Sequence, residues 1–447
     1  MRNLTKFVGI IAIITIISLF MAACDETDDV NNSSNNGSTH QPPTSGLSFT
    51  LIDGPAYSVS IGEATAVHIV IPAKHNDLPV TIIKNNGFKD SSILSVSIPN
   101  SITTIGSSAF SGCKGITKLT IPNSVTSIGV GAFSGCTGLT SVTIPNSVTS
   151  IGNSAFSGCT SLTSITIGSG VTSIGGFSGC TSLTSITIPN NVTSIDSSAF
   201  SGCSGLTSVT IPNSVTSIGS SAFSRTGLTN ITIGNNVRTI GESAFSYCTR
   251  LTSITIENGS IGNSAFSGCT SLTSITIGNN VWTIGESAFS NCTRLTSVTI
   301  PDFVFSIGNS AFYRCSGLTN VTIGSGIIGE SAFEDCEIMT SVIIRNSVRT
   351  IGKSAFSGCT SLTNVTIENG VTSIRDSAFQ NCISITSITI PNSITFVGGA
   401  VFWLWTSSQI IYIPYLTLEQ ADTNWSNYWR TYCSAKIMNS EGEQVWP

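Results

Sequence analysis

Apolar and polar residues recur in one fixed order along most of the chain, and the copy between Leu139 and Ser161 shows it clearly. Val142 and Ile144 alternate with Thr143, which is the pattern of a strand that buries one face. A Pro-Asn-Ser turn follows, and a second short β-branched run begins at Val148. Each copy therefore predicts two short strands joined by a tight turn.

The remainder of the unit holds an Ala-Phe step and a Cys, at spacings that a short turn can point inward. The Phe recurs about every 23 residues, and some spacings are shorter by two, which preserves the side-chain alternation of an extended segment. The recurring positions are Phe110, Phe133, Phe156, Phe177, Phe200, Phe223, Phe245, Phe266, Phe289, Phe312, Phe333, Phe356 and Phe379, with degenerate copies at Phe88 and Phe402. Since one unit cannot bury its apolar face alone, we predict a mainly β repeat solenoid of about 15 stacked coils.

Residues 1–23 contain the one long apolar run, preceded by Arg2 and Lys6 and ended by Met-Ala-Ala before Cys24. This order predicts an export signal, and the last residues resemble the lipobox of bacterial lipoproteins. In that group Cys24 is the lipidated N-terminus, so a lipid anchor in the bacterial envelope is expected. The alternatives are an ordinary signal peptide and an uncleaved anchor.

The other boundaries follow from changes in composition. Residues 24–46 are polar and predict a disordered tether. Residues 47–90 predict a strand-rich N-terminal cap with the first coil, and 91–402 the regular solenoid. Residues 403–447 lose the repeat and hold most of the Trp residues; a short amphipathic helix within 416–429, with Thr417 as its N-cap, would close that end.

All but two of the 14 cysteines hold one position of the repeat, from Cys113 to Cys382; the others are Cys24 and Cys433. An exported protein ordinarily suggests disulfides. Stacked copies, however, would hold their Cβ atoms near the coil spacing, beyond the ~3.8 Å that a disulfide prefers. Free, buried thiols are therefore the favoured interpretation, with a disulfide framework or a metal site as alternatives.

The charge of the chain and its few histidines argue against several classes of function. Only 9% of residues are charged and the net charge is −5, which argues against nucleic-acid binding. The only histidines are His40, His68 and His75, and none of them forms a recurring pair with a serine of the repeat. The sequence also contains no metal-ligand spacing and no phosphate-binding glycine loop. We expect neither an enzyme nor a cofactor.

Departures from the repeat are the candidate contact residues. After the Val of the second strand most copies have Thr, but four have larger residues. These are Arg238, Trp282, Phe305 and Arg349, with Phe303 close to Phe305 and Tyr247, Arg250, Arg294, Tyr313 and Arg314 in nearby turns. Trp, Phe and Arg are typical of binding hot spots, whereas drift at exposed positions is the alternative. The repeated Thr and Ser positions are explained by strand propensity and solubility; the alternatives are a polar binding face and an ice-binding face.

The repeat L-T-x-[IV]-T-I-P-x-[SN]-V-T-x-I-G-x-x-A-F-x-x-C resembles the BspA-like (treponemal-type) leucine-rich repeat over roughly residues 66–402. The resemblance implies a bacterial surface or secreted protein that adheres to host matrix, host cells or other microbes through protein or glycan ligands. We therefore expect a cell-surface leucine-rich repeat lipoprotein; the alternative is a structural envelope protein without a specific ligand.

Overall fold

The computed structural model describes residues 41–439 and 441–446, and its compact repeat unit begins at Pro43. The expected signal peptide, Cys24 and the tether up to residue 40 lie outside the described residues. Thr44, inside the segment expected to be tether, already bonds to the first coil, because its amide donates to the Val70 carbonyl at 3.1 Å. The repeat unit is a β-solenoid of about 17 turns, which confirms the predicted fold class and lengthens the array slightly.

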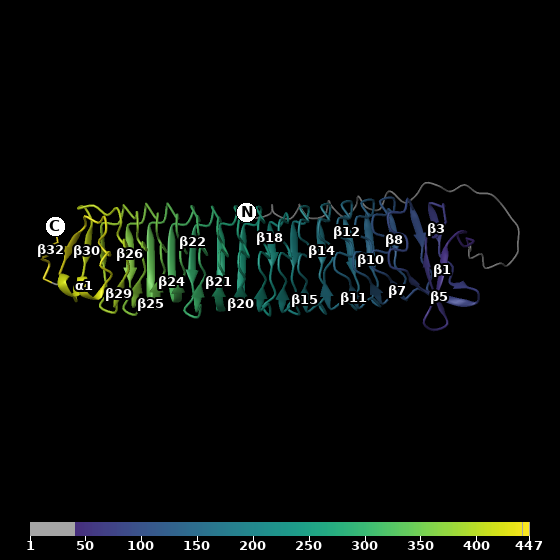
Figure 1. Cartoon of the computed structure of the whole chain (residues 1–447), viewed down its shortest axis with the longest axis horizontal. Coiled ribbons are helices and arrows are strands. Elements are labelled where there is room, and N and C mark those ends of the chain that lie inside the picture. The colour runs from purple at the N-terminus through teal and green to yellow at the C-terminus, as the bar shows by residue number, and fades with distance from the viewer. Residues whose placement is uncertain (1–40, 440, 447) are drawn as a thin grey trace, which may run out of the picture. The chain divides into compact units, whose positions relative to one another are not determined.

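Two columns of short parallel strands run along the array (Figure 1). The first column comprises β3 (His68–Val70), β6 (Ser95–Ser97), β8 (Lys118–Thr120), β10 (Ser141–Ile144), β12 (Ser164–Ile167), β14 (Ser185–Thr187), β16 (Ser208–Thr210), β18 (Asn230–Thr232), β22 (Ser297–Ile300), β26 (Asn364–Ile367), β28 (Ser387–Thr389) and β30 (Ile410–Tyr412). The second comprises β5 (Leu78–Ile83), β7 (Thr104–Ile105), β9 (Ser127–Ile128), β11 (Ser150–Ile151), β13 (Ser173–Ile174), β15 (Ser194–Ile195), β17 (Ser217–Ile218), β19 (Thr239–Ile240), β23 (Ser306–Ile307), β27 (Ser373–Ile374) and β29 (Phe396–Val397). Four long strands span both columns: β20 (Ser253–Ile261), β21 (Ser274–Ile284), β24 (Asn320–Ile328) and β25 (Ser341–Ile351).

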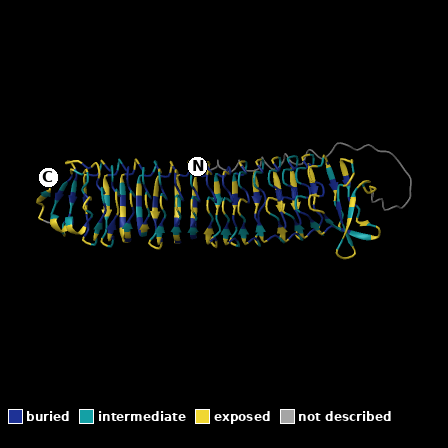
Figure 2. Cartoon of the chain, viewed as in Figure 1, coloured by how far each residue is buried: buried dark blue, intermediate teal, exposed yellow. Residues whose placement is uncertain are grey.

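Equivalent residues pair from one coil to the next, so each apolar position forms a column through the core. Val142 of β10 pairs with Ile165 of β12, and all strand pairs within the array are parallel. The repeat Phe rings from Phe88 to Phe379 stack with centroids 5.0 to 5.7 Å apart and near-parallel planes. Buried and exposed residues alternate along many of the strands, as in β10 and β12 (Figure 2). The repeat pattern thus builds one continuous apolar core.

Three coils are shorter by two residues. Two of them confirm that the side-chain alternation of the strand is preserved, and in the third this prediction is wrong. β20 and β24 each lose two residues through register shifts, and Ile261 still pairs with Ile284. In the coil of Phe177 the loss instead falls in the turn at Gly175 and Gly176, which leaves an open hollow of about 500 Å³ lined mostly by Ser residues. That segment is a turn, so strand alternation does not govern it.

Both predicted caps are present. β1 (Ser48–Ile52) and β2 (Ala56–Ser60) form an antiparallel hairpin, and β2 covers the free edge of β5. The insertion after Pro72 is a second hairpin, in which β4 (Lys74–His75) pairs with the start of β5.

At the C-terminal end, α1 (Leu418–Asn424) has Thr417 as its N-cap, as predicted, with a capping box to Gln420. The helix is shorter than expected because the chain turns at Trp425, which is buried with Trp429 against the last coil. Two further strands, β31 (Lys436–Met438) and β32 (Gln444–Trp446), extend the sheet beyond β30. These strands were not predicted, since residues after Pro414 carry no repeat.

Candidate binding surface

The Thr that follows the second-strand Val has a structural role in most coils. Its hydroxyl donates to the carbonyl of the equivalent residue one coil earlier, as from Thr126 to Thr103 at 3.3 Å and from Thr216 to Thr193 at 3.2 Å. The Thr140 column makes the same bond to Thr117 at 3.0 Å. These bonds account for both Thr columns as scaffold.

The larger residues predicted as contacts occupy this position and give up that hydroxyl bond. Trp282 lies in β21 and Phe305 just before β23, and the two are neighbours because the Phe305 amide donates to the Trp282 carbonyl at 2.8 Å. The next coil continues the row, since the Ile327 amide donates to the Phe305 carbonyl at 3.2 Å. Two consecutive coils therefore replace a bonded Thr with an aromatic side chain, and the third places Ile327 where the preceding coil has Ser306.

The exposed members of this surface are Trp282, Phe303, Phe305 and Ile327, which we call the apolar column. Phe305 is 69% exposed, Phe303 63%, Ile327 52% and Trp282 44%. Burying a large apolar side chain stabilises by about 1.5–3 kcal/mol, so four neighbouring ones left in water form a strong candidate contact site. The structure thus brings together three of the predicted residues.

Ile327 was missed by the sequence reasoning. It lies in the shortened strand β24, where it pairs with Ser306 of the preceding coil and Thr350 of the next, and the deletion hides this position in the sequence. The signal was available in Gly-Ser-Gly-Ile-Ile-Gly, whose first Ile stands where other copies have Thr or Ser. The preceding Gly326 has a φ of +94°, a left-handed conformation that favours glycine.

The two predicted arginines lie at the ends of the row rather than within the apolar column. The Arg238 carbonyl accepts from the Ser260 amide at 3.0 Å. Ser260 lies in the coil before that of Trp282, so Arg238 lies two coils before Trp282. Arg349 follows Ile327 by one coil, and its Nη1 donates to the carbonyls of Asn346 at 2.9 Å and Gly370 at 3.1 Å. The Arg349 guanidinium is therefore held against the turn.

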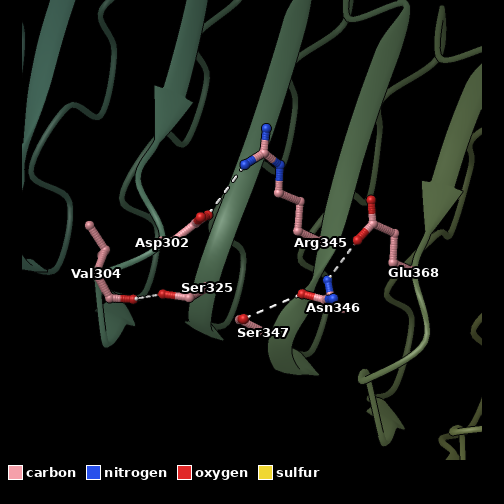
Figure 3. A network of polar contacts seen from close by, with 7 residues as sticks. All are labelled: Asp302, Val304, Ser325, Arg345, Asn346, Ser347 and Glu368. Atoms are coloured by element: carbon pink, nitrogen blue, oxygen red, sulfur yellow. Dashed lines mark hydrogen bonds and ion pairs between the residues drawn. The ribbon is translucent and has the colours of Figure 1, made fainter.

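Figure 3 shows an ion pair between Arg345 and Asp302, the residue that directly precedes Phe303 in the chain. Arg345 reaches past the shortened coil to Asp302, with Nη1 and Oδ1 3.4 Å apart, while the Glu368 carboxylate accepts from the Asn346 amide at 3.0 Å. The ion pair borders an open hollow of about 410 Å³ that also includes Thr299. Both charged groups are about half exposed, so the pair adds little stability and leaves polar groups beside the apolar ones.

The predicted turn residues lie in a different part of the coil. Tyr247, Arg250, Arg294, Tyr313 and Arg314 follow the stacked Phe, whereas the apolar column belongs to the second strand. They form a separate edge of the array, to which we return below.

The cysteines at the repeat position have a structural role. Its twelve thiols are free and buried, which confirms the favoured interpretation. Each donates to the Phe carbonyl of the preceding coil, as from Cys292 to Phe266 at 3.3 Å. Burial raises the pKa of the Cys315 thiol to about 12, so the reactive thiolate is strongly disfavoured at neutral pH.

The coils that lack Cys fill the same position with another donor. Thr226 takes it in the coil of Phe223 and lies 3.2 Å from the Cys248 sulfur. The indole of Trp405 takes it in the last coil and donates to the Phe379 carbonyl at 3.0 Å. A hydrogen-bond donor, rather than thiol chemistry, is what the position shares.

Other candidate chemistry is sparse. His68 Nδ1 lies 2.8 Å from the Ser95 hydroxyl on the exposed surface, and His75 stacks on Phe49. Among the described residues no group of three or more His, Cys, Asp or Glu is arranged to hold a metal ion. Cys433, unassigned from sequence, is half-buried in the C-terminal cap.

The repeats match the BspA type Leucine rich repeat region over residues 81–178, 175–259, 257–338 and 326–425, which is most of the chain. The chain belongs to the BspA-type leucine-rich repeat family. A leucine-rich repeat protein from Bacteroides ovatus is similar at 27% identity and a TM-score of 0.56, with 88% of this chain and 98% of that one covered.

A leucine rich cell surface protein from Faecalibacterium prausnitzii is 26% identical, with a TM-score of 0.42 and coverage of 90% and 96%. No curated protein sequence matches this BspA-type chain. Within the part that the structure describes, no helix has the length and apolar character to cross a membrane.

Proposed function

We propose that this BspA-type protein is an exported, lipid-anchored surface protein that binds protein or glycan ligands on host or microbial surfaces without catalysing a reaction. The observation that carries the proposal is the apolar column. Its aromatic side chains stand in water on two consecutive coils, and Trp282 and Phe305 occupy positions where the consensus Thr would make a hydrogen bond. Aromatic side chains with flanking arginines are the residue types that dominate binding energy.

The scaffold suits this role. The strands that hold Trp282 and Phe305 are paired on both sides, so their backbone is fixed before any ligand arrives. A rigid surface loses less conformational entropy on binding than a flexible loop does. A ligand that buries Trp282 and Phe305 therefore keeps most of the energy gained from excluding water.

Export and lipidation are proposed from the sequence of residues 1–24 together with the family. The related Faecalibacterium protein is described as a cell surface protein. Replacing Cys24 with Ser tests the anchor: the lipid-modified species detected by mass spectrometry should disappear, and the protein should leave the membrane fraction. Unchanged modification and membrane association would refute lipid attachment at Cys24.

The binding proposal is tested with the full chain in detergent, presented to immobilised matrix proteins, mucins and bacterial surfaces. We expect saturable binding to one of these, weakened at least about tenfold by Trp282→Ala with Phe305→Ala. The matched control is Val130→Ala with Ile383→Ala, two exposed apolar residues elsewhere on the array. Absence of saturable binding to any of the surfaces would favour the alternative, a structural envelope protein without a specific ligand.

A further inference from the structure

The turn after each stacked Phe contains a residue with left-handed backbone. In five consecutive coils it is glycine, with φ near +70°, at Gly112, Gly135, Gly158, Gly179 and Gly202. From the coil of Phe223 onward large residues adopt the same conformation: Arg225 has a φ of 57°, Tyr247 of 56° and Arg314 of 55°. Left-handed backbone is unfavourable for any residue with a Cβ, and such strain concentrates at functional sites.

The same turns concentrate positive charge. Arg225, Arg250, Arg294 and Arg314 are all exposed and lie on four of five consecutive coils, in a chain that has only 18 Lys and Arg residues in total. With Tyr247 and Tyr313 they form what we call the turn edge. At a coil spacing of ~4.8 Å the edge extends for about 20 Å along the array.

Few acidic groups neutralise the turn edge. Of its four arginines only Arg314 takes part in an ion pair among the described residues, with Asp335 at 3.3 Å. Asp335 belongs to the next coil, where Glu334 and Glu337 also lie in the turn and mark the end of the basic stretch. The edge therefore has an unneutralised positive charge over most of its length, although the whole chain is acidic.

The two tyrosines hold neighbouring guanidinium groups in place. The Arg225 guanidinium lies 5.7 Å from the centre of the Tyr247 ring, and that of Arg314 lies 4.9 Å from the centre of the Tyr313 ring. The Tyr247 ring lies over Gly268 of the next coil, where a Cβ would come within 2.7 Å of the ring. Glycine at that one position leaves room for the ring to lie against the array, while more than half of Tyr247 remains exposed.

We propose that the turn edge binds an acidic polysaccharide, with the guanidinium groups contacting its sulfate or carboxylate groups and the exposed ring of Tyr247 stacking on a sugar. An extended ligand is favoured because the arginines all lie in the turn after the stacked Phe and are spread along the length of the array. Guanidinium groups bind oxyanions through paired hydrogen bonds to two oxygens, which suits both sulfate and carboxylate groups. A nucleic acid would need a wider basic surface and meets the acidic turn at Asp335.

The inference adds a second surface to the proposed function and does not require the apolar column. The test uses the full chain in detergent and surface plasmon resonance with four probes: heparin, polygalacturonate, polyglutamate and neutral dextran. Heparin should bind, and its affinity should be at least about tenfold lower in 500 mM than in 50 mM NaCl, because salt screens exposed charges. Polygalacturonate separates the two chemistries: equal binding means that carboxylates suffice, whereas heparin binding alone assigns sulfate.

Three variants locate the site. Arg250→Ala with Arg294→Ala should weaken heparin binding at least about tenfold, since each removes a charge-assisted contact. Arg345→Ala, which removes an exposed arginine outside the turn edge, should bind as the wild type does. Tyr247→Gly should raise Tm by relieving the left-handed strain and yet weaken binding, a combination that a purely structural role would not produce.

Several outcomes would overturn the proposal. These are binding to dextran as tight as to heparin, salt-insensitive binding, capture of polyglutamate but of neither polysaccharide, or an arginine double variant that binds heparin normally. Trp282→Ala with Phe305→Ala separates the two surfaces: heparin binding should persist in this variant even where binding to a protein ligand is lost. Failure of the apolar column and failure of the turn edge are thus distinguishable.

Discussion

Raising the pH above 9 is expected to destabilise the array through its buried thiols. Burial raises the pKa of Cys159, Cys315 and Cys359 to about 12, against an ordinary value of 9.0. The unfolded chain therefore releases these protons at a lower pH than the folded chain. The stabilisation that this difference represents is complete below pH 9 and is lost progressively as the pH rises from 9 to 12.

The size of the loss follows from the two pKa values. At pH 10 each of the three thiols lowers the free energy of unfolding by about 1.4 kcal/mol relative to pH 8. A segment that unfolds with one of them loses that amount, and a segment that contains all three loses about 4 kcal/mol, because solenoids can unfold in parts. Either value is a large fraction of the stability of an ordinary domain.

The assay is urea unfolding followed by far-UV circular dichroism at pH 8, 9 and 10. The matched variant replaces Cys159, Cys315 and Cys359 with Ser, whose hydroxyl does not titrate in this range. Ser91 holds the Cys position in the coil of Phe88, and its hydroxyl donates to the Phe88 carbonyl at 2.7 Å. The column therefore accepts a hydroxyl. The variant should be less stable at pH 8 but lose less stability by pH 10; an equal loss in both proteins would refute the assignment to the thiols.

Three further changes test other parts of the scaffold by thermal or urea unfolding. Gly158→Ala should lower the free energy of unfolding by about 1 kcal/mol, because Gly158 has a φ of +70°; no loss would contradict the strain argued for the turn edge. Phe266→Leu should cost more than Phe88→Leu, by about 0.5–1.5 kcal/mol, because Phe266 stacks on rings at both sides and Phe88 on one; equal losses would mean that stacking adds nothing beyond burial. Thr417→Ala should lower the stability of the C-terminal cap by about 1 kcal/mol through loss of its capping box, with Thr417→Ser as the control that retains the hydroxyl; a Ser variant as unstable as the Ala variant would contradict this explanation.

The regular coils could be predicted because their pattern is redundant. Every copy repeats the same inward residues, and the stacking of Phe156 on Phe133 and Phe177 follows from the period alone. The C-terminal cap was predicted only in part. Its helix start at Thr417 has a local signal, whereas β31 and β32 depend on pairing with β30, which no pattern in residues 415–447 encodes.

The candidate surfaces were predictable as residue types but not as groupings. Trp282 and Phe305 could be recognised because they interrupt a regular Thr position, yet their neighbour Ile327 was concealed by a two-residue deletion. The strain at Arg225 and Tyr247 is a backbone property. It follows from the glycine that earlier copies have at the same place, but only once that glycine is known to be left-handed.

The distribution of departures along the array separates scaffold from function. Between the coils of Phe110 and Phe200 the left-handed turn position stays glycine, the ladder position stays Thr and the Cys column is complete. From Arg225 to Arg349 the turn position and the ladder position both change repeatedly, and each change gives up a favourable conformation or a hydrogen bond. Neutral drift would affect exposed positions in both halves alike. The concentration of costly changes in one half therefore argues that selection for binding acts there, while the first half, with its uniform coils, holds that region away from the N-terminus.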